Sequence, residues 1–240
     1  MQTKNSQKIR RMVILAVFAA LAYVAMLAIH IKVGFLTMDV KDTIITLCGL
    51  YFGPVASLII SVLVPLVEFA TVSNTGLYGL IMNILGSVPF SVTASLIYKW
   101  KKTFSGAIAA LTAAAFAMTG VMLLANLFIT PYYMGATVAD VKAMIPTLLL
   151  PFNAIKAVLN VGLVLLLYKH IGNALRKAGF LPRKAPSLAL TENDGTVAAQ
   201  TPQRPAFWRT VIVTASAAVL IAVSLVIIFV VLGGKFDFGV

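Results

Sequence analysis

The chain has 240 residues, of which 60% are hydrophobic and 11% are charged, and its formal net charge is +12. A typical soluble domain carries about 25% charged residues, so this composition excludes an ordinary water-soluble domain and predicts an all-α, multi-pass membrane protein. The positive charge does not indicate nucleic-acid binding, because the basic residues gather at the ends of apolar segments, where they mark the topology.

The first two apolar segments differ in length. Met12–Ile31 is long enough to span a bilayer, and it lacks the small-residue cleavage site of a signal peptide, so a retained helix is expected. Thr43–Phe52 is barely long enough. It either begins earlier or is tilted and partly covered by the loop before it. Gly53 and Pro54 predict a turn at its end.

Four longer segments complete a predicted bundle of six helices. They are Val55–Val72, Leu77–Tyr98, Gly106–Ile129 and Ile145–Tyr168. Each approaches the roughly 20 apolar residues that a helix needs to cross hydrocarbon. Residues 1–182 are therefore expected to form one six-helix membrane domain.

A linker and a seventh helix are expected after this bundle. Residues 183–206 are rich in Pro, Thr, Ala and Gln with little to bury, which predicts a flexible cytoplasmic linker. Residues 207–240 contain the apolar run Val211–Leu232, which predicts an additional membrane-spanning helix.

The basic residues predict how the chain crosses the cell membrane. Most of the 19 Lys and Arg residues lie before the first helix, between the fourth and fifth helices, or after the sixth. Loops rich in Lys and Arg stay in the cytoplasm. The N-terminus is therefore expected to be cytoplasmic, and the C-terminus lies outside if the seventh helix spans.

Three polar residues of the sixth helix share one face. Asn153, Lys156 and Asn160 are spaced i, i+3 and i+7, so their side chains project from the same side of the helix. Polar groups in hydrocarbon are costly, and an ionisable residue there indicates a functional site.

Polar residues of three other helices are expected at a similar depth. Glu68, Asn83 and Asn126 lie in the outer half on the predicted topology, as do Asn153 and Lys156. As an alternative, Glu68 and Lys156 form a buried ion pair, and the asparagines join helices through hydrogen bonds worth about 0.6–2 kcal/mol each. Five such groups at one depth favour a cavity that opens outward.

The loops at the same end carry further candidates. Asp39, Thr75, Tyr132 and Tyr133 are expected near the mouth of this cavity. The two tyrosines fit either the aromatic belt of a membrane interface or a stacking surface over a flat ligand.

Motifs for catalysis and for ATP hydrolysis are missing from the sequence. There is no G-x-x-x-x-G-K-[ST] phosphate loop and no H-E-x-x-H zinc motif, and His30 and His170 lie near opposite membrane faces. We therefore expect no enzyme activity, no catalytic residue, no metal site and no cofactor.

Residues 8–182 resemble the substrate-binding S components of energy-coupling factor (ECF) vitamin transporters, and most closely the riboflavin-specific ones. The resemblance rests on the order and spacing of FLTMDVKD, YFGPVASLIIS, VEFATVSNTGLYGLIMNILGS, NLFITPYYMG and LLPFNAIKAVLN followed by LYK. It implies a six-helix protein that captures riboflavin from outside. A transmembrane coupling subunit and two ATPase subunits would supply the energy. The seventh helix departs from this pattern.

The resemblance also implies roles for individual side chains. Alanines four apart allow close approach of helices, so Ala16 and Ala20, with Ala19 nearby, would dock to the coupling subunit. For riboflavin, we assign the polar edge of the ring to Asn126, Asn153, Lys156 and Asn160. Glu68 and Asn83 are assigned to the tail or to a supporting position, and Tyr132 or Tyr133 to the ring faces.

Three other functions fit the same residues. An S component for another vitamin or for FMN would pair Lys156 with the phosphate. A proton-coupled secondary transporter would need Glu68 to titrate. In a purely structural membrane protein, the polar residues would only hold the helices together.

Overall fold

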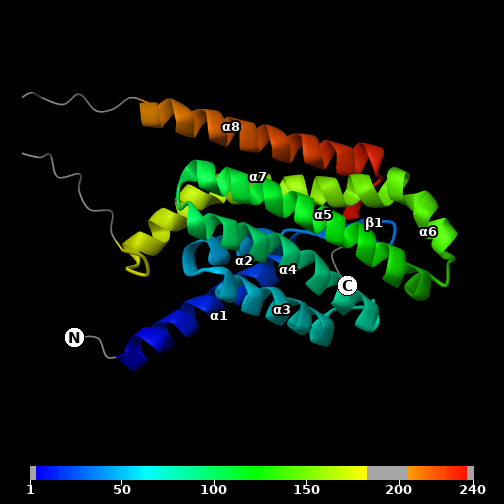
Figure 1. Cartoon of the computed structure of the whole chain (residues 1–240), viewed down its shortest axis with the longest axis horizontal. Coiled ribbons are helices and arrows are strands. Elements are labelled where there is room, and N and C mark those ends of the chain that lie inside the picture. The colour runs from blue at the N-terminus through cyan, green and yellow to red at the C-terminus, as the bar shows by residue number, and fades with distance from the viewer. Residues whose placement is uncertain (1–3, 183–204, 237–240) are drawn as a thin grey trace, which may run out of the picture.

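The computed structural model describes residues 4–182 and 205–236. Its helices lie side by side in an elongated bundle, with a small β-sheet near one end (Figure 1). The prediction of an all-α membrane bundle is confirmed. The helices are α1 (Lys4–Ala28), α2 (Lys41–Phe52), α3 (Pro54–Thr71), α4 (Gly76–Trp100), α5 (Phe104–Met134), α6 (Val138–Met144), the π-helix η1 (Ile145–Leu149), α7 (Leu150–Lys177), α8 (Pro205–Val226) and the π-helix η2 (Ile227–Val231).

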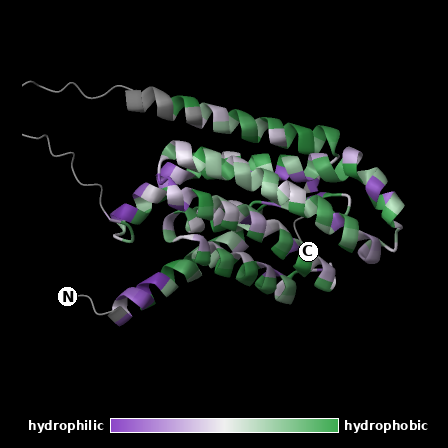
Figure 2. Ribbon diagram, viewed as in Figure 1, coloured by the Kyte–Doolittle hydropathy of each residue, from purple (hydrophilic) through white to green (hydrophobic). Residues whose placement is uncertain are grey.

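Six helical segments in the described ranges are long and apolar enough to cross a membrane. They are α1, α3, α4, α5, the run from α6 to α7, and the run from α8 to η2. Hydrophobic residues dominate the middle of the bundle, and hydrophilic residues gather at the beginning of α1 and the end of α7 (Figure 2). This pattern is that of a multi-pass membrane protein.

The short helix α2 is enclosed by the rest of the bundle. It has 12 residues, and nine of them are buried. It contacts α1, α3, α4 and α7. It begins at Lys41, two residues before the predicted start, and protein covers it on most sides, so its length does not need to match the membrane.

A β-hairpin replaces the predicted end of the first helix and the polar stretch after it. β1 (His30–Val33) and β2 (Leu36–Asp39) pair antiparallel. The predicted helix end at Ile31 is therefore wrong, because α1 ends at Ala28. The two-residue turn begins with Gly34, whose φ of 60° lies in the left-handed region that favours glycine.

The connection between α5 and α7 is more helical than predicted. α5 continues beyond Ile129 through Pro131 to Met134, although Pro lacks the N–H for one helical hydrogen bond. Gly135, with a φ of 64°, ends it. The side chain of Thr137 caps α6, where the sequence predicted a loop.

The C-terminal segment packs on the bundle. α8 lies alongside α7 (Figure 1), and strand β3 (Lys235–Phe236) pairs with β1, which gives the strand order β2-β1-β3. The expected seventh helix is present and begins at Pro205. Of the predicted linker, residues 183–204 lie outside the described ranges.

Two apolar clusters hold these elements together. The larger one fills the middle of the bundle, where Phe18, Phe90 and Leu111 are buried. The second, called the hairpin core below, joins the hairpin to α6, η1, α7 and η2. Its buried members are Ile31, Val33, Leu36, Met38, Val141, Leu149, Phe152, Leu159 and Ile228.

Candidate functional site

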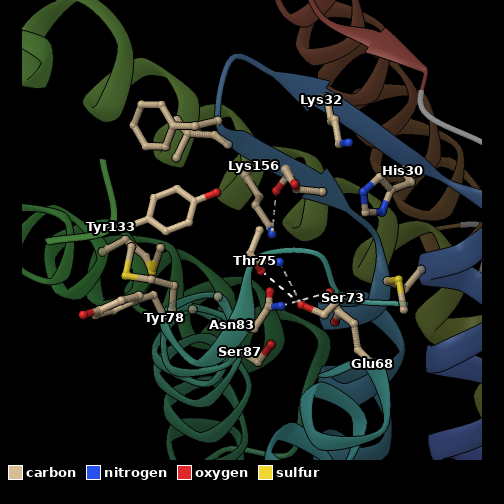
Figure 3. A pocket seen from close by; sticks show the side chains of 18 of the residues that line it. His30, Lys32, Glu68, Ser73, Thr75, Tyr78, Asn83, Ser87, Tyr133 and Lys156 are labelled. Atoms are coloured by element: carbon tan, nitrogen blue, oxygen red, sulfur yellow. Dashed lines mark hydrogen bonds between the residues drawn. The ribbon is translucent and has the colours of Figure 1, made fainter. Parts of the chain in front are cut away.

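A cavity of about 750 Å³ opens at the hairpin end of the bundle. Residues of the hairpin, the α3–α4 loop, α4, α5 and α7 line it (Figure 3). Its volume lies within the roughly 300–1,000 Å³ typical of sites for small molecules. The cavity thus has the size for one small organic ligand.

Most of the predicted ligand-binding residues come together around this cavity. Those that line it are Glu68, Thr75, Asn83, Asn126, Tyr133, Asn153 and Lys156. They come from α3, the α3–α4 loop, α4, α5 and α7, as the common depth of the polar groups predicted.

Three predicted residues do not line the cavity. Tyr132 is 77% exposed. Asn160 is fully buried, accepts a hydrogen bond from Thr43 Oγ1 at 2.6 Å and donates to the Lys156 carbonyl at 3.0 Å, so it joins α2 to α7. Asp39 is buried in an ion-pair network. These positions favour structural roles for Asn160 and Asp39.

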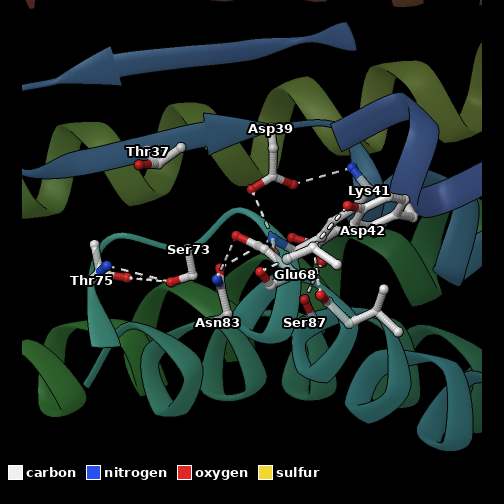
Figure 4. A network of polar contacts seen from close by, with 12 residues as sticks. Thr37, Asp39, Lys41, Asp42, Glu68, Ser73, Thr75, Asn83 and Ser87 are labelled. Carbon is white, nitrogen blue, oxygen red and sulfur yellow. Dashed lines mark hydrogen bonds and ion pairs between the residues drawn. The ribbon is translucent and has the colours of Figure 1, made fainter. Parts of the chain in front are cut away.

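The network has Lys41 at its centre (Figure 4). Lys41 is 1% exposed. An ammonium group has three N–H donors, and Lys41 makes three side-chain hydrogen bonds, to Asp39 at 3.2 Å, Glu68 at 2.9 Å and Asn83 at 3.1 Å. Asn83 also donates to Glu68 at 2.9 Å. Lys41 therefore holds two cavity-lining side chains, Glu68 and Asn83, in place.

Asp39 connects this network to α7. Its Oδ2 atom accepts hydrogen bonds from Lys41 at 3.2 Å and from Lys156 at 3.1 Å. The predicted alternative, an ion pair between Glu68 and Lys156, is thus replaced by two others, Glu68 with Lys41 and Asp39 with Lys156. Buried charges in a low dielectric need such partners.

Asp42 directly follows Lys41 on α2. It is 1% exposed, lines the cavity and accepts a hydrogen bond from Ser87 of α4. Sequence reasoning missed Lys41 and Asp42, since both fall in the polar stretch before the predicted helix start at Thr43. The signal for them was a run of alternating charges, DVKD, directly before an apolar helix too short to span.

Asn153 offers the cavity an unused acceptor. It is 1% exposed, and its Nδ2 atom donates to the Leu149 carbonyl at 2.8 Å. Its Oδ1 atom has no hydrogen-bond partner within the described residues. The π-helix η1 lies just before it, and such turns are frequent at functional sites. A buried carbonyl oxygen without a partner, on a residue that lines a cavity, favours a ligand with an N–H or O–H donor.

Asn126 differs from Asn153 although both line the cavity. Its Nδ2 atom donates to the Met122 carbonyl at 2.7 Å, and its Oδ1 atom accepts from Thr130 at 2.9 Å. Both ends of this amide are therefore used within α5.

The remaining walls are aromatic and sulfur-rich. Tyr78 and Tyr133 form an edge-on pair with ring centroids 6.4 Å apart (Figure 3). Phe152 also lines the cavity, with methionines from α1, α4 and α5. Aromatic rings and thioethers suit the faces of a flat ring. Sequence reasoning missed Tyr78, and it also missed His30 and Lys32 at the mouth.

The described residues contain no group of three or more His, Cys, Asp or Glu side chains that could hold a metal ion.

On the outside of the bundle, Ala16 and Ala20 are exposed on α1, whereas Ala19 is half-buried against the larger core. Two of the three alanines predicted to dock a partner are thus open to contact.

Comparison with known proteins identifies relatives of this chain. Residues 10–168 match the family described as the substrate-specific component of ECF transporters. The riboflavin transporter RibU of Staphylococcus aureus (strain TCH60) is 30% identical over 182 residues, which cover 72% of this chain and 96% of that protein. A solved S component of a bacterial ECF transporter is 28% identical, with a TM-score of 0.61, over 70% of this chain and 99% of that chain.

Proposed function

The chain belongs to the family of substrate-specific components of ECF transporters, and from this membership we propose that it captures riboflavin from outside the cell. Separate coupling and ATPase subunits then drive uptake. The observation that carries the proposal is the cavity of about 750 Å³ that Asn153 and Lys156, one helical turn apart on α7, both line. Among the described residues, the Oδ1 atom of Asn153 has no hydrogen-bond partner.

The chemistry of this pair suits the ring of riboflavin. The pyrimidine edge of that ring alternates N–H donors with carbonyl acceptors. Asn153 Oδ1 accepts from the ring N–H, and Lys156 donates to a ring carbonyl. Two hydrogen bonds from Lys156, to Asp39 and to the Thr37 carbonyl, leave one of its three donors for the ligand.

The rest of the cavity suits the other parts of the molecule. Tyr78, Tyr133 and Phe152 cover the faces of the ring. Glu68 and Asn83, fixed by Lys41, offer polar atoms to the ribityl hydroxyls. The amides of Asn126 and Asn160 are already hydrogen-bonded within the protein, so we assign the ring edge to Asn153 and Lys156 alone.

The likeness to the riboflavin transporter of Staphylococcus aureus supports the choice of ligand. The charge pattern supports an outward opening. The basic beginning of α1 and the basic end of α7 lie at one end of the bundle, and the hairpin lies at the other (Figures 1 and 2). The cavity opens at the hairpin end. With the basic end in the cytoplasm, the cavity faces outside.

Glu68 is a poor candidate for a proton carrier. Its two carboxylate oxygens accept hydrogen bonds from Lys41 and Asn83, which favours a structural role. Uptake in cells tests the energy source. Uptake lost with a catalytically inactive ATPase partner but retained with a protonophore supports the ECF mechanism, and the opposite result supports proton coupling.

Riboflavin titration of the detergent-purified chain, followed by quenching of flavin fluorescence, tests the ligand. Asn153→Ala combined with Lys156→Ala should weaken binding at least tenfold, a change of about 1.4 kcal/mol. Asn173→Ala, at an exposed asparagine near the other end of α7, is the matched control and should bind normally. An FMN titration tests the alternative ligand. Folded wild-type protein that leaves riboflavin fluorescence unchanged would contradict the proposal.

A further inference from the structure

The hairpin between α1 and α2 has two different faces. Ile31 and Val33 of β1 are buried in the hairpin core, while His30 and Lys32 line the cavity. This alternation is that of a strand with one face on a core. The hairpin is therefore one wall of the cavity, and its position sets how wide the mouth opens.

The C-terminal segment continues this wall. β3 pairs with the free edge of β1, with Lys235 opposite Lys32. An isolated two-stranded hairpin is at best marginally stable, whereas a third strand with an apolar face confers stability. β3 thus changes the hairpin from a two-stranded ribbon into a three-stranded sheet.

The chain reaches β1 through a close turn after η2. Gly233 has a φ of 64°, and the N–H of Gly234 donates to the Ile228 carbonyl at 2.9 Å. A Cβ added at Gly234 would lie 2.7 Å from Ile228 Cγ2 and 3.1 Å from Ile31 Cγ2. Glycine is needed here because β3 passes directly over the hairpin core.

α8 and η2 are firmly docked at the base of this turn. Ile228 is fully buried among hairpin-core residues. Along α8, Ala217 is also fully buried, and its carbonyl oxygen would lie 3.3 Å from a Cβ at Gly162 of α7. Such close approach through small residues is a common mode of helix packing in membranes. β3 is therefore anchored to α7, which also carries Asn153 and Lys156.

This segment lies outside the part of the chain that matches the family. The family match ends at residue 168. The riboflavin transporter of Staphylococcus aureus is covered over 96% of its length and the solved S component over 99%, yet more than a quarter of this chain lies outside each alignment.

We propose that residues 205–236 act as a strap that holds the hairpin over the cavity and slows the escape of bound ligand. The strap rests on the proposed function in that it requires riboflavin to occupy this cavity. Movement of the hairpin away from α7 would widen the mouth of the cavity, and the strap ties the hairpin to α7 through β3, η2 and α8.

A reversible crosslink in the full-length protein tests the strap. Lys32→Cys with Lys235→Cys places two thiols at directly opposed positions of an antiparallel pair, and the native Cys48 is buried. The oxidised form should release riboflavin about tenfold more slowly than the reduced form of the same protein. The single cysteine variants are the controls.

A second variant loosens the strap instead. Gly234→Val should speed riboflavin release about threefold to tenfold, as expected for the loss of one or two strand hydrogen bonds. Gly120→Val is the control, because a Cβ there meets nothing within 4 Å. Unfolding temperatures are measured in parallel, since a tail that only stabilises the fold changes them without changing the release rate.

The outcomes separate the strap from the ligand assignment. A disulfide that fails to form contradicts the β1–β3 pairing and overturns the strap. Normal riboflavin binding with unchanged release in both experiments also overturns it and leaves the proposed function intact. If the wild-type chain binds no riboflavin, the proposed function fails and the strap fails with it.

Discussion

The carboxylate of Asp39 lies 3.1 Å from the ammonium of Lys156, so an ion pair joins the last residue of β2 to the polar face of α7. Both side chains are at least nine-tenths buried. The pair fixes the hairpin relative to the helix that carries the proposed ligand contacts. A ligand that accepts the remaining donor of Lys156 therefore binds next to this ion pair, which couples binding to the position of the hairpin.

Replacement of Lys41 by methionine should strongly destabilise the protein. The substitution leaves Asp39 and Glu68 without their shared cation, and removal of one partner from a buried ion pair typically costs about 3–5 kcal/mol. Thermal unfolding in detergent measures the loss. Lys142→Met, at an exposed position of α6, should change stability by less than about 0.5 kcal/mol. Adding Glu68→Gln to Lys41→Met should recover part of the loss, and equal effects of the two lysine substitutions would contradict the role of Lys41.

The two asparagines of the cavity should differ in their effect on riboflavin binding. Asn153→Ala removes an acceptor that has no partner in the part of the chain that the structure describes, and it should weaken binding about tenfold or more. Asn126→Ala removes an amide whose hydrogen bonds all stay within α5, so binding should change by less than about threefold. Fluorescence titration of folded variants measures both. A larger loss from Asn126→Ala would indicate that α5 contacts the polar edge of the ring and would contradict the assignment to α7.

Close packing around Gly49 predicts a steric effect on stability. A Cβ at Gly49 of α2 would lie 2.6 Å from Ser57 Cβ of α3 and would also meet the Ser95 hydroxyl of α4. Gly49→Ala should therefore destabilise the bundle by about 1–3 kcal/mol through overpacking. Gly120→Ala, where the added methyl meets open space, should be neutral or slightly stabilising because alanine favours helices. Unfolding temperatures that fall equally in both variants would point to a general helix effect.

A bulky side chain on the exposed face of α1 should block assembly with a coupling subunit. Ala16→Trp fills a position that is open to contact next to Ala20. Co-purification with the coupling and ATPase subunits should be lost, while riboflavin binding by the isolated chain is retained. Ala109→Trp, at an exposed alanine of α5, is the matched control. Normal assembly of the Ala16 variant would exclude this face as the docking site.

The helices and much of the cavity were predictable from sequence because they depend on local patterns. Long apolar runs gave the spanning segments, and polar residues within them, such as Glu68 and Asn153, have little reason to lie in hydrocarbon without a function. The spacing of Asn153 and Lys156 placed them on one face of α7. That spacing does not show that Asn160 turns toward Thr43 and away from the cavity.

The hairpin and the network depend on contacts between distant segments. The strands HIKV and LTMD have four residues each and follow an apolar helix directly. Their alternation of apolar and polar residues is therefore too short to be distinguished from the end of that helix. Lys41 looked like a loop charge because its burial arises only when Glu68 and Asn83, from two later helices, close around it. Because these partners are 27 and 42 residues away, the sequence immediately around Lys41 does not indicate that it is buried.

The enclosure of α2 also has a consequence for biogenesis. A helix of 12 residues with Lys41 and Asp42 in its first turn cannot partition into lipid alone, because it is too short to cross hydrocarbon and its charges have no partners there. Lys41 gains its ion pair with Glu68 and its hydrogen bond to Asn83, and Asp42 its hydrogen bond from Ser87, only when α3 and α4 are in place. The ribosome has therefore to deliver these later helices before α2 reaches its final depth, so its insertion is a late and cooperative event although it is second in the chain.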